Sequence, residues 1–204
     1  MRSFLRALDQ QRWDDHRYYH HSRINQSLHL FSALTFLSSY VLLAMGRSVA
    51  AVLLGWLLAM LSRQVGHFFF EPKDYDEANG ASHQHKEQIK VGYNLRRKVV
   101  LLSIWGLSPL VLLLQPTLFG LFEAPASRDA FLQNLSHLWL GIAGGGLLFR
   151  TSHLFFLKDV QTGLVWFAKI LTDPFHDVAL YYKAPLWVAR GELLDPMDRS
   201  AEQV

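Results

Sequence analysis

The sequence predicts an all-α fold: a polytopic membrane helical bundle of about four transmembrane helices plus interfacial helices, with both termini in the cytoplasm. Two observations carry this prediction. Half of the 204 residues are hydrophobic, and they gather into four long blocks. The lysines and arginines alternate in number between the segments that separate these blocks. The length suits one integral-membrane domain, residues 1–204.

Each apolar block approaches the length of a helical span, which needs about 20 residues. The blocks cover residues 28–45, 49–70, 99–114 and 134–157. The first two are separated only by a short polar break around Arg47, so they predict a transmembrane hairpin, and Pro72 is expected to end its second helix. Together the four blocks predict a four-span bundle over residues 28–157.

The segments outside the bundle are more polar. Residues 1–27 form a lead-in with an expected interfacial helix over residues 4–19. The tail, residues 158–204, contains no uncharged run long enough for a fifth span, so we expect a surface-lying or re-entrant segment there. Within it, residues 160–171 predict an amphipathic helix that the Asp173-Pro174 pair breaks.

Counts of lysine and arginine set the orientation. The five segments outside the spans carry 5, 1, 6, 1 and 5 of these residues in chain order. Cytoplasmic segments are enriched in positive charge, so the alternation favours four spans with both ends inside. Aromatic residues near the span ends are interpreted as an interfacial belt; they are Tyr18, Tyr19, Trp105, Trp139, Tyr181, Tyr182 and Trp187.

Composition excludes several classes of function. The chain has no cysteine, so disulfides, thiolate metal sites and cysteine nucleophiles are excluded. The net charge is +3, and the lysines and arginines are distributed between the segments as in a membrane protein. We therefore expect membrane lipids and no nucleic acid as partners. Any bound metal would take histidine, carboxylate or backbone oxygen ligands, which suit iron, zinc or manganese.

The histidines are the candidate functional residues. The predicted topology places nine of the ten at the cytoplasmic end of the bundle. A single histidine at a span end is more typical of an interfacial polar residue, but this clustering predicts a shared metal site. We expect His20, His29, His67 and His153 as ligands because they lie at the mouths of spans. Further candidates, as ligands or as partners that orient them, are His16, His21, Glu71, His83, His85, His176, Asp173 and Asp177.

Two arginines at the same level, Arg63 and Arg150, are candidates for binding a substrate carboxylate. Anchoring of the spans by positive charge is the alternative interpretation of both. His83 and His85 are two residues apart and would share a metal only from an extended loop.

Three short motifs resemble a known family. His20-His21 with Asn25 and His29 opening a span, Gly66-His67 with Glu71 closing one, and Ala184-Pro185-Leu186 near the end of the chain are similar to motifs of the membrane 2-hydroxy fatty acid dioxygenase family. In that family the Gly-His motif commonly lies late in the chain. Here it is early, and the late position holds His153 without a glutamate four residues on.

The resemblance implies an Fe(II)-dependent enzyme that uses dioxygen to shorten a 2-hydroxy fatty acid by one carbon. It implies a multi-pass protein of the inner membrane in a bacterium, or of the endoplasmic reticulum in a eukaryote. Two alternatives stay open. A di-iron hydroxylase or desaturase would use the histidine box formed by His16, His20 and His21. A non-enzymatic membrane scaffold, or a protein that handles metal such as zinc or protons, would use the same rings without catalysis.

Overall fold

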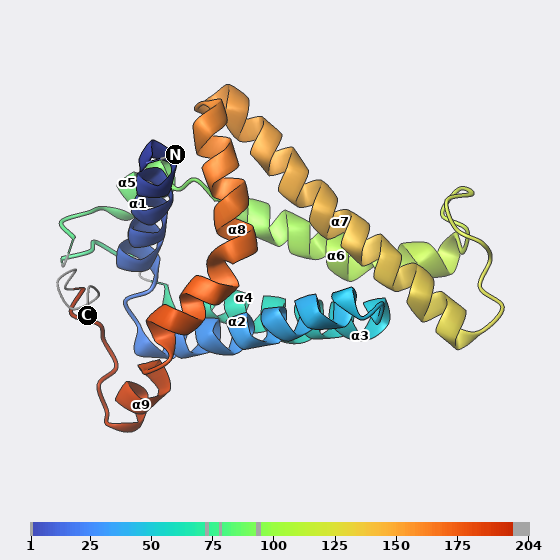
Figure 1. The fold of residues 1–204 in the computed structure, drawn as a ribbon, viewed down its shortest axis with the longest axis horizontal. Coiled ribbons are helices and arrows are strands. Elements are labelled where there is room, and N and C mark those ends of the chain that lie inside the picture. Colours follow the sequence, from blue (N-terminus) through green and yellow to red (C-terminus); the bar gives the residue numbers. More distant parts are fainter. Residues whose placement is uncertain (1, 72–73, 78, 93–94, 198–204) are drawn as a thin grey trace.

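The computed structural model describes residues 2–71, 74–77, 79–92 and 95–197, and all its regular elements in these ranges are helices (Figure 1). In chain order they are α1 (Arg2–Tyr19), α2 (Arg23–Ala44), α3 (Ser48–Leu53), η1 (Leu54–Met60), α4 (Leu61–Val65), η2 (Gly66–Phe70), α5 (His83–Ile89), α6 (Leu95–Leu114), α7 (Arg128–Leu157), α8 (Val160–Tyr181) and α9 (Ala184–Ala189). The elements η1 and η2 are π-helical turns, and with α3 and α4 they form the one long helix Ser48–Phe70.

Four helices in the described chain are long and apolar enough to cross a membrane, which confirms the predicted all-α fold with about four candidate spans. They are Arg23–Ala44, Ser48–Phe70, Arg96–Leu114 and Arg128–Leu157. Only 17% to 28% of the residues in their apolar windows are buried inside the protein. Their outward faces therefore carry large apolar side chains, which is the arrangement that lipid requires and water does not.

Side-chain caps explain where two of these helices begin. The Ser22 hydroxyl accepts a hydrogen bond from the Asn25 amide at the start of α2. Ser127 does the same for Ala130 at the start of α7, so that helix begins at Arg128 rather than at residue 134. Serine is a favoured N-cap because its hydroxyl satisfies an amide that has no partner within the helix.

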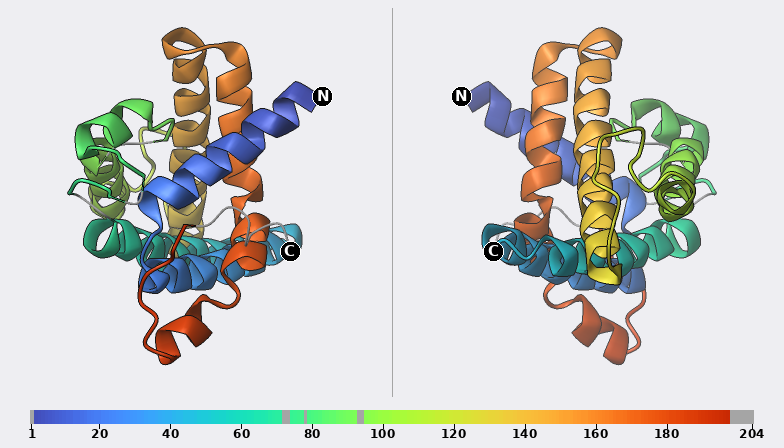
Figure 2. Two further views of the ribbon diagram at one scale, coloured as in Figure 1. Left: turned by 90° about the vertical axis from the view of Figure 1, so that its left-hand side faces the viewer. Right: turned by 90° about the vertical axis from the view of Figure 1, so that its right-hand side faces the viewer.

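The hairpin of α2 and Ser48–Phe70 packs along its whole length, and α8 crosses over it. Figure 1 shows α7 and α8 meeting at an acute angle, with α6 beside α7, and Figure 2 shows α1 lying across α8. At the far end of the bundle, Trp105 stacks on Trp56 and packs against Trp139. This apolar core leaves the other end of the hairpin for polar residues.

The prediction for residues 160–171 was wrong at its end. The helix α8 continues through Asp173-Pro174 to Tyr181, and it is a packed part of the bundle rather than a surface-lying segment. Pro174 is buried, and Asp173 beside it is held by Lys169 and Arg12. Packing and ion pairing outweigh the helix-breaking tendency of proline here.

The predicted aromatic belt is also largely wrong. Five of its seven members are buried in the protein, namely Tyr18, Tyr19, Trp105, Trp139 and Tyr181, while Tyr182 is exposed. The Trp139 indole donates to the Ser108 hydroxyl at 2.7 Å. A buried ring whose polar atom finds an internal partner is indistinguishable in sequence from an interfacial one.

The polar segments fold back onto the start of α2. The described part of the link between the second and third spans contains α5. At the end of the chain, the Arg23 amide donates to the Leu193 carbonyl at 2.9 Å, and the Asp195 amide donates to the His21 carbonyl at 2.8 Å. The tail thus forms a strap, residues 193–195, beside the link between α1 and α2.

Pro72, which was expected to end the second span, lies outside the described residues. The helix ends at Phe70, and Glu71 has extended backbone (φ −75°, ψ 130°). A residue that precedes proline is biased toward this conformation.

Substitution of Gly163 tests the packing of α8 on α7. A Cβ atom at Gly163 would lie 2.8 Å from the Thr151 carbonyl oxygen and 2.6 Å from the Phe155 ring. We expect Gly163→Ala to lower the free energy of unfolding by about 1–3 kcal/mol, the usual cost of overpacking. Thermal unfolding in detergent measures it. Gly141→Ala is the control, because a Cβ there meets nothing within 4 Å; equal stability of the two variants would contradict the packing argument.

Candidate metal centre

Three of the predicted histidines lie together. His20 is in the link between α1 and α2, His29 is on the second turn of α2, and His67 is on η2. One ring nitrogen from each lies within 4.8 Å of those of the other two. The ring centroids are 4.1 Å apart for His20 and His29, 5.0 Å for His29 and His67, and 5.4 Å for His20 and His67. This histidine group is compact enough to bind one metal ion.

Two amide side chains position His20. The Asn25 side-chain amide donates to the Tyr19 carbonyl at 2.9 Å, and that of Gln26 donates to the His20 carbonyl at 2.8 Å. Both residues are in the first turn of α2 and fully buried. They fix the non-helical link over the start of α2, so the His20 ring is held above His29.

Gly66 allows His67 to reach the same place. A Cβ atom at Gly66 would lie 2.1 Å from the Asn25 side-chain oxygen and 3.6 Å from the His29 ring. Only a residue without a side chain permits α2 and η2 to approach so closely. The π-helical turn η2 begins at Gly66 and carries His67, and such turns are frequent at functional sites.

The histidine group is buried and incompletely hydrogen-bonded. His20, His29 and His67 are 2%, 0% and 8% exposed. Both ring nitrogens of His20 and of His29 are buried without a hydrogen-bond partner in the described chain. Buried polar atoms in proteins are nearly always partnered, so four orphaned imidazole nitrogens side by side call for a ligand.

The third ring is oriented by a carboxylate. The Glu71 side chain lies 2.7 Å from Nδ1 of His67, and its other oxygen accepts from Lys90 at 3.0 Å. This leaves Nε2 of His67 as the nitrogen that can bind a metal, in the arrangement common for metal-ligating histidines. Burial and the neighbouring His29 ring hold the pKa of His20 well below its ordinary value, so His20 is a neutral imidazole, the form that binds metal.

A buried charge cluster adjoins the histidine group. Arg63 pairs with Asp177 at 3.2 Å and lies 3.9 Å from Asp173. Lys169 bonds to Asp173 and, at 3.0 Å, to Asp15 of α1. A carboxylate oxygen of Asp177 is also 3.6 Å from Nδ1 of His29.

The cluster balances its own charge. Arg12 reaches Asp173 at 3.4 Å, so three cations face the three carboxylates. Burial raises the pKa of Asp15, but the ammonium of Lys169 and the other positive groups nearby, Arg63 among them, together outweigh it and hold that pKa well below its ordinary value. The cluster therefore joins α1, α4 and α8 through ion pairs.

Other predicted residues have structural partners instead. His16 is buried and shares a 3.1 Å hydrogen bond with the Tyr181 hydroxyl. His21 points away from His20, toward Asp76 at 3.2 Å and the Arg17 carbonyl. Neither ring is in the histidine group, so the histidine box expected from His16, His20 and His21 does not form.

His153, which was expected as a fourth ligand, lies in a different environment from the other three histidines. His153 is on α7 outside the histidine group, with its ring stacked on Phe149 and 3.3 Å from the guanidinium of Arg150. Arg150 itself donates to the Val91 carbonyl at 2.6 Å and to the Gly92 carbonyl at 3.3 Å. This arginine fixes the chain before α6 and does not line the cavity described below.

The remaining candidates also lie elsewhere or act differently. His83 and His85 are exposed on α5, a helix rather than an extended loop. His176 is half-buried on α8 outside the group, and burial and the nearby Arg12 lower its pKa. Asp173 and Asp177, expected to orient His176, instead hold Arg63, Lys169 and Arg12.

Several residues of this region have no signal in the sequence. Tyr181 is buried with its ring 5.9 Å from that of His20 and 6.2 Å from that of His29. Burial and the nearby Asp177 raise its pKa, so the phenol keeps its proton. Asp15, Lys169 and Lys98 also face the site. The i, i+4 spacing of Lys169 and Asp173 is the one pattern that could have drawn attention to the charge cluster.

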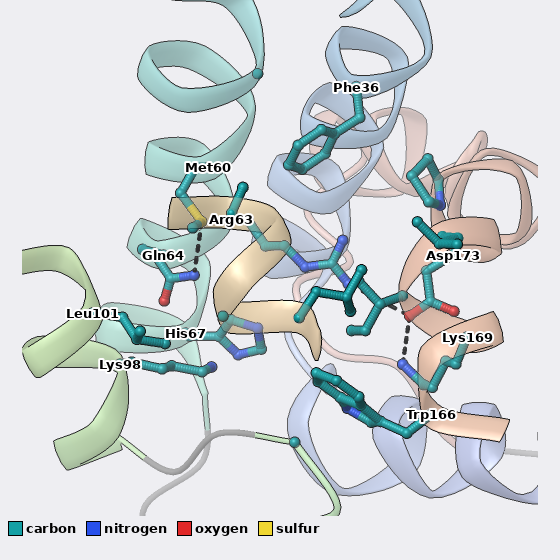
Figure 3. A pocket seen from close by; sticks show the side chains of 18 of the residues that line it. Phe36, Met60, Arg63, Gln64, His67, Lys98, Leu101, Trp166, Lys169 and Asp173 are labelled. Carbon is teal, nitrogen blue, oxygen red and sulfur yellow. Dashed lines mark hydrogen bonds and ion pairs between the residues drawn. The ribbon is translucent and has the colours of Figure 1, made fainter. Parts of the chain in front are cut away.

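A cavity of about 620 Å³ opens beside the histidine group (Figure 3). His67, Arg63, Lys98, Lys169 and Asp173 line its polar end. Comparison with family models, with curated proteins and with solved structures gave no match for this chain. The arrangement of the site can bind a metal ion at one edge of a cavity large enough for a small molecule.

Substitution of Gly66 tests how the histidine group is assembled. Gly66→Ala places a methyl group against Asn25, so we expect η2 to move away from α2 and the histidine group to open. Metal bound per chain after purification should fall at least tenfold, because displaced ligand atoms no longer share one ion. Gly55→Ala is the control: its Cβ meets the Ser39 hydroxyl at 3.3 Å in the same helix pair. Full metal content in Gly66→Ala would contradict this account.

Substitution of Arg63 tests the charge cluster. Arg63→Met leaves the buried carboxylate of Asp177 without its cationic partner, which costs about 3–5 kcal/mol of stability. Thermal unfolding in detergent measures the loss. The double variant Arg63→Met with Asp177→Asn removes the stranded charge and should recover most of it. A single variant as stable as the wild type would show that the pair is not a structural tie.

Proposed function

We propose that this protein is a membrane-embedded oxidoreductase in which His20, His29 and His67 bind one Fe(II) and which acts with dioxygen on a fatty acyl substrate. The observation that carries the proposal is the set of buried, orphaned imidazole nitrogens of His20 and His29 beside the carboxylate-oriented ring of His67. In its most specific form, the enzyme is a 2-hydroxy fatty acid dioxygenase that shortens the chain by one carbon.

The residues present fit such a metal. Neutral imidazoles suit Fe(II) as well as zinc, and three protein ligands leave positions open for other molecules. When bound, Fe(II) supplies the redox chemistry with dioxygen that these side chains lack. Glu71 orients His67, and a carboxylate oxygen of Asp177 lies 3.6 Å from Nδ1 of His29. Tyr181 and the amides of Asn25 and Gln26 shield the rings from water.

The stoichiometry of the reaction requires no external reductant. Conversion of a 2-hydroxy acid to carbon dioxide and the carboxylic acid one carbon shorter releases four electrons. One dioxygen molecule accepts these four electrons, and water is formed. The cavity beside His67 suits the substrate, because it is polar at the histidine group and lined by apolar side chains such as Trp56 and Val52 further away.

The resemblance to the dioxygenase family and the distribution of positive charge support the proposed location of the protein in the cell. The residues of the histidine group fall on motifs similar to those of the 2-hydroxy fatty acid dioxygenase family. The alternation of positive charge favours both termini and the histidine group on the cytoplasmic face of a multi-pass protein. That membrane would be the inner membrane of a bacterium or the endoplasmic reticulum of a eukaryote.

The grouping of only three histidines favours one metal ion over two. A di-iron hydroxylase needs ligands from several histidine boxes, whereas His16, His21 and His153 lie outside the group with other partners. Zinc binding without catalysis would use the same three rings. That metal-handling role differs from the oxygenase in giving no oxygen consumption.

Elemental analysis of detergent-purified protein tests the metal. We expect about one iron per wild-type chain and at least a tenfold loss in His20→Ala, His29→Ala and His67→Ala, because each substitution removes a ligand. His153→Ala and His85→Ala are matched controls and should retain iron. Two irons per chain, or equal iron in all five variants, would overturn the single-ion site.

An activity assay tests the reaction. The iron-loaded protein should consume one dioxygen per 2-hydroxyhexadecanoate and release pentadecanoate, measured with an oxygen electrode and by mass spectrometry of the products. His67→Ala should abolish both signals. Iron retention without oxygen consumption would favour the metal-handling alternative.

A further inference from the structure

The cavity beside the histidine group runs between the two halves of the bundle. Its walls come from α2, the helix Ser48–Phe70, α6, α7 and α8, with α1 and the chain before α6 at the polar end. Away from the histidines the lining is apolar and includes Phe36, Leu43, Val52, Trp56 and Leu102. The cavity thus has one charged end and one apolar end. This matches the polarity of a single-tailed amphiphile, which has a polar head group and an apolar tail.

The charges at the polar end identify the head group. Four cationic side chains line the cavity: Arg63, Lys90, Lys98 and Lys169. Three of them are matched by carboxylates, since Arg63 pairs with Asp177, Lys90 with Glu71, and Lys169 with Asp15 and Asp173.

Lys98 differs from the other three. Within the described residues it has no hydrogen-bond or ion-pair partner, and Figure 3 shows its ammonium group pointing toward the His67 ring. An unmatched cation at the polar end of an apolar cavity selects an anion.

The apolar part of the cavity has a natural probe. Gly144 on α7 lines the cavity, and a Cβ atom there would meet nothing within 4 Å. A larger side chain at Gly144 would therefore grow into the empty space. Gly145, the next residue, is equally free of contacts but exposed and outside the cavity lining. The pair separates filling of the cavity from any general effect on the helix.

We propose that this cavity binds one single-tailed carboxylic acid, with Lys98 pairing with the carboxylate beside His67 and Gly144 leaving room for the acyl tail. The assignment rests on the proposed function for its choice of a fatty acid. It adds a head-group residue and a tail-length residue that the metal site does not require. Neither Lys98 nor Gly144 belongs to the histidine group, so binding can be measured on metal-free protein.

The test is equilibrium binding of radiolabelled hexadecanoate and 2-hydroxyhexadecanoate to metal-free protein in phosphatidylcholine nanodiscs. Lys98→Gln should weaken binding of both acids about 10- to 100-fold, the effect of one hydrogen bond to a charged group. It should leave binding of the hexadecanoate methyl ester unchanged. Lys98→Arg keeps the charge and should bind normally. Arg96→Gln, on the same helix but exposed and outside the cavity lining, is the matched control.

Tail length is tested with saturated acids of 10 to 20 carbons (a range on the order of the span length). Gly144→Leu should shift the preferred acid to a shorter chain, and each methylene that no longer fits should cost about fourfold in affinity. Gly145→Leu should bind like the wild type. Identical profiles for the two variants would overturn the assignment of the tail.

Three results would overturn the head-group assignment. They are unchanged acid binding in Lys98→Gln, equal binding of hexadecyltrimethylammonium, and stronger competition by phosphatidylglycerol than by the free acid, which would make a phospholipid the ligand. Iron content measured on the same variants separates the two proposals. If Lys98→Gln binds the acid normally while His67→Ala loses iron, only the cavity assignment fails. If Lys98→Gln loses the acid while His67→Ala keeps its metal content, only the metal site fails.

Discussion

The charge cluster around Arg63 is the constraint on which the rest of this structure depends. Arg63 is three residues from Gly66 in a helix that is otherwise apolar, and a guanidinium there is tolerated only with carboxylate partners. Those partners, Asp173 and Asp177, come from α8. The need to neutralise one arginine therefore explains why a helix too charged to be a span packs across the hairpin. The ion pair between Asp15 and Lys169 attaches α1 to α8 beside the same cluster.

The histidine group is built by a different kind of constraint. Asn25 holds the link that carries His20, and the absence of a side chain at Gly66 lets η2 approach Asn25. The same asparagine thus controls the position of one ring directly and of another by contact. The histidine group and the charge cluster meet at Asp177, which pairs with Arg63 and lies beside His29. A shift of α8 would therefore move Asp177 relative to the ring of His29.

The spans were predictable because their signals are local. Long apolar blocks and the alternation of positive charge predict four membrane helices without knowledge of the packing, and the described part of the chain contains four candidate spans. The depth of a residue along a span is also local, which is why His20, His29 and His67 were expected at one level. Its direction around the helix axis is not local. His153 has a suitable depth but faces Arg150 and Phe149.

The other features of the fold and of the site depend on contacts between segments that are far apart in the sequence. α8 is not among the helices apolar enough to span a membrane, and it carries Lys169, Asp173 and Asp177, whose charges find partners only in the folded bundle. The buried tyrosines and tryptophans resemble a membrane belt until their partners are known. Lys98 could be distinguished from anchoring lysines only by its lack of an ion-pair partner among the described residues. The sequence therefore predicts at which end of the spans the site lies, but not all of the residues that form it.

The distance along the chain between Arg63 and its partners has a consequence for biosynthesis. Asp177 is separated from Arg63 by 114 positions, with the third and fourth spans between them. During translation the first hairpin must enter the membrane before α8 exists, so Arg63 is stranded there without a counter-ion. The strap at residues 193–195 that flanks His21 is made later still. A chain that ends before α8 therefore carries an arginine near the end of its second apolar helix without the two carboxylates that pair with it in the complete fold.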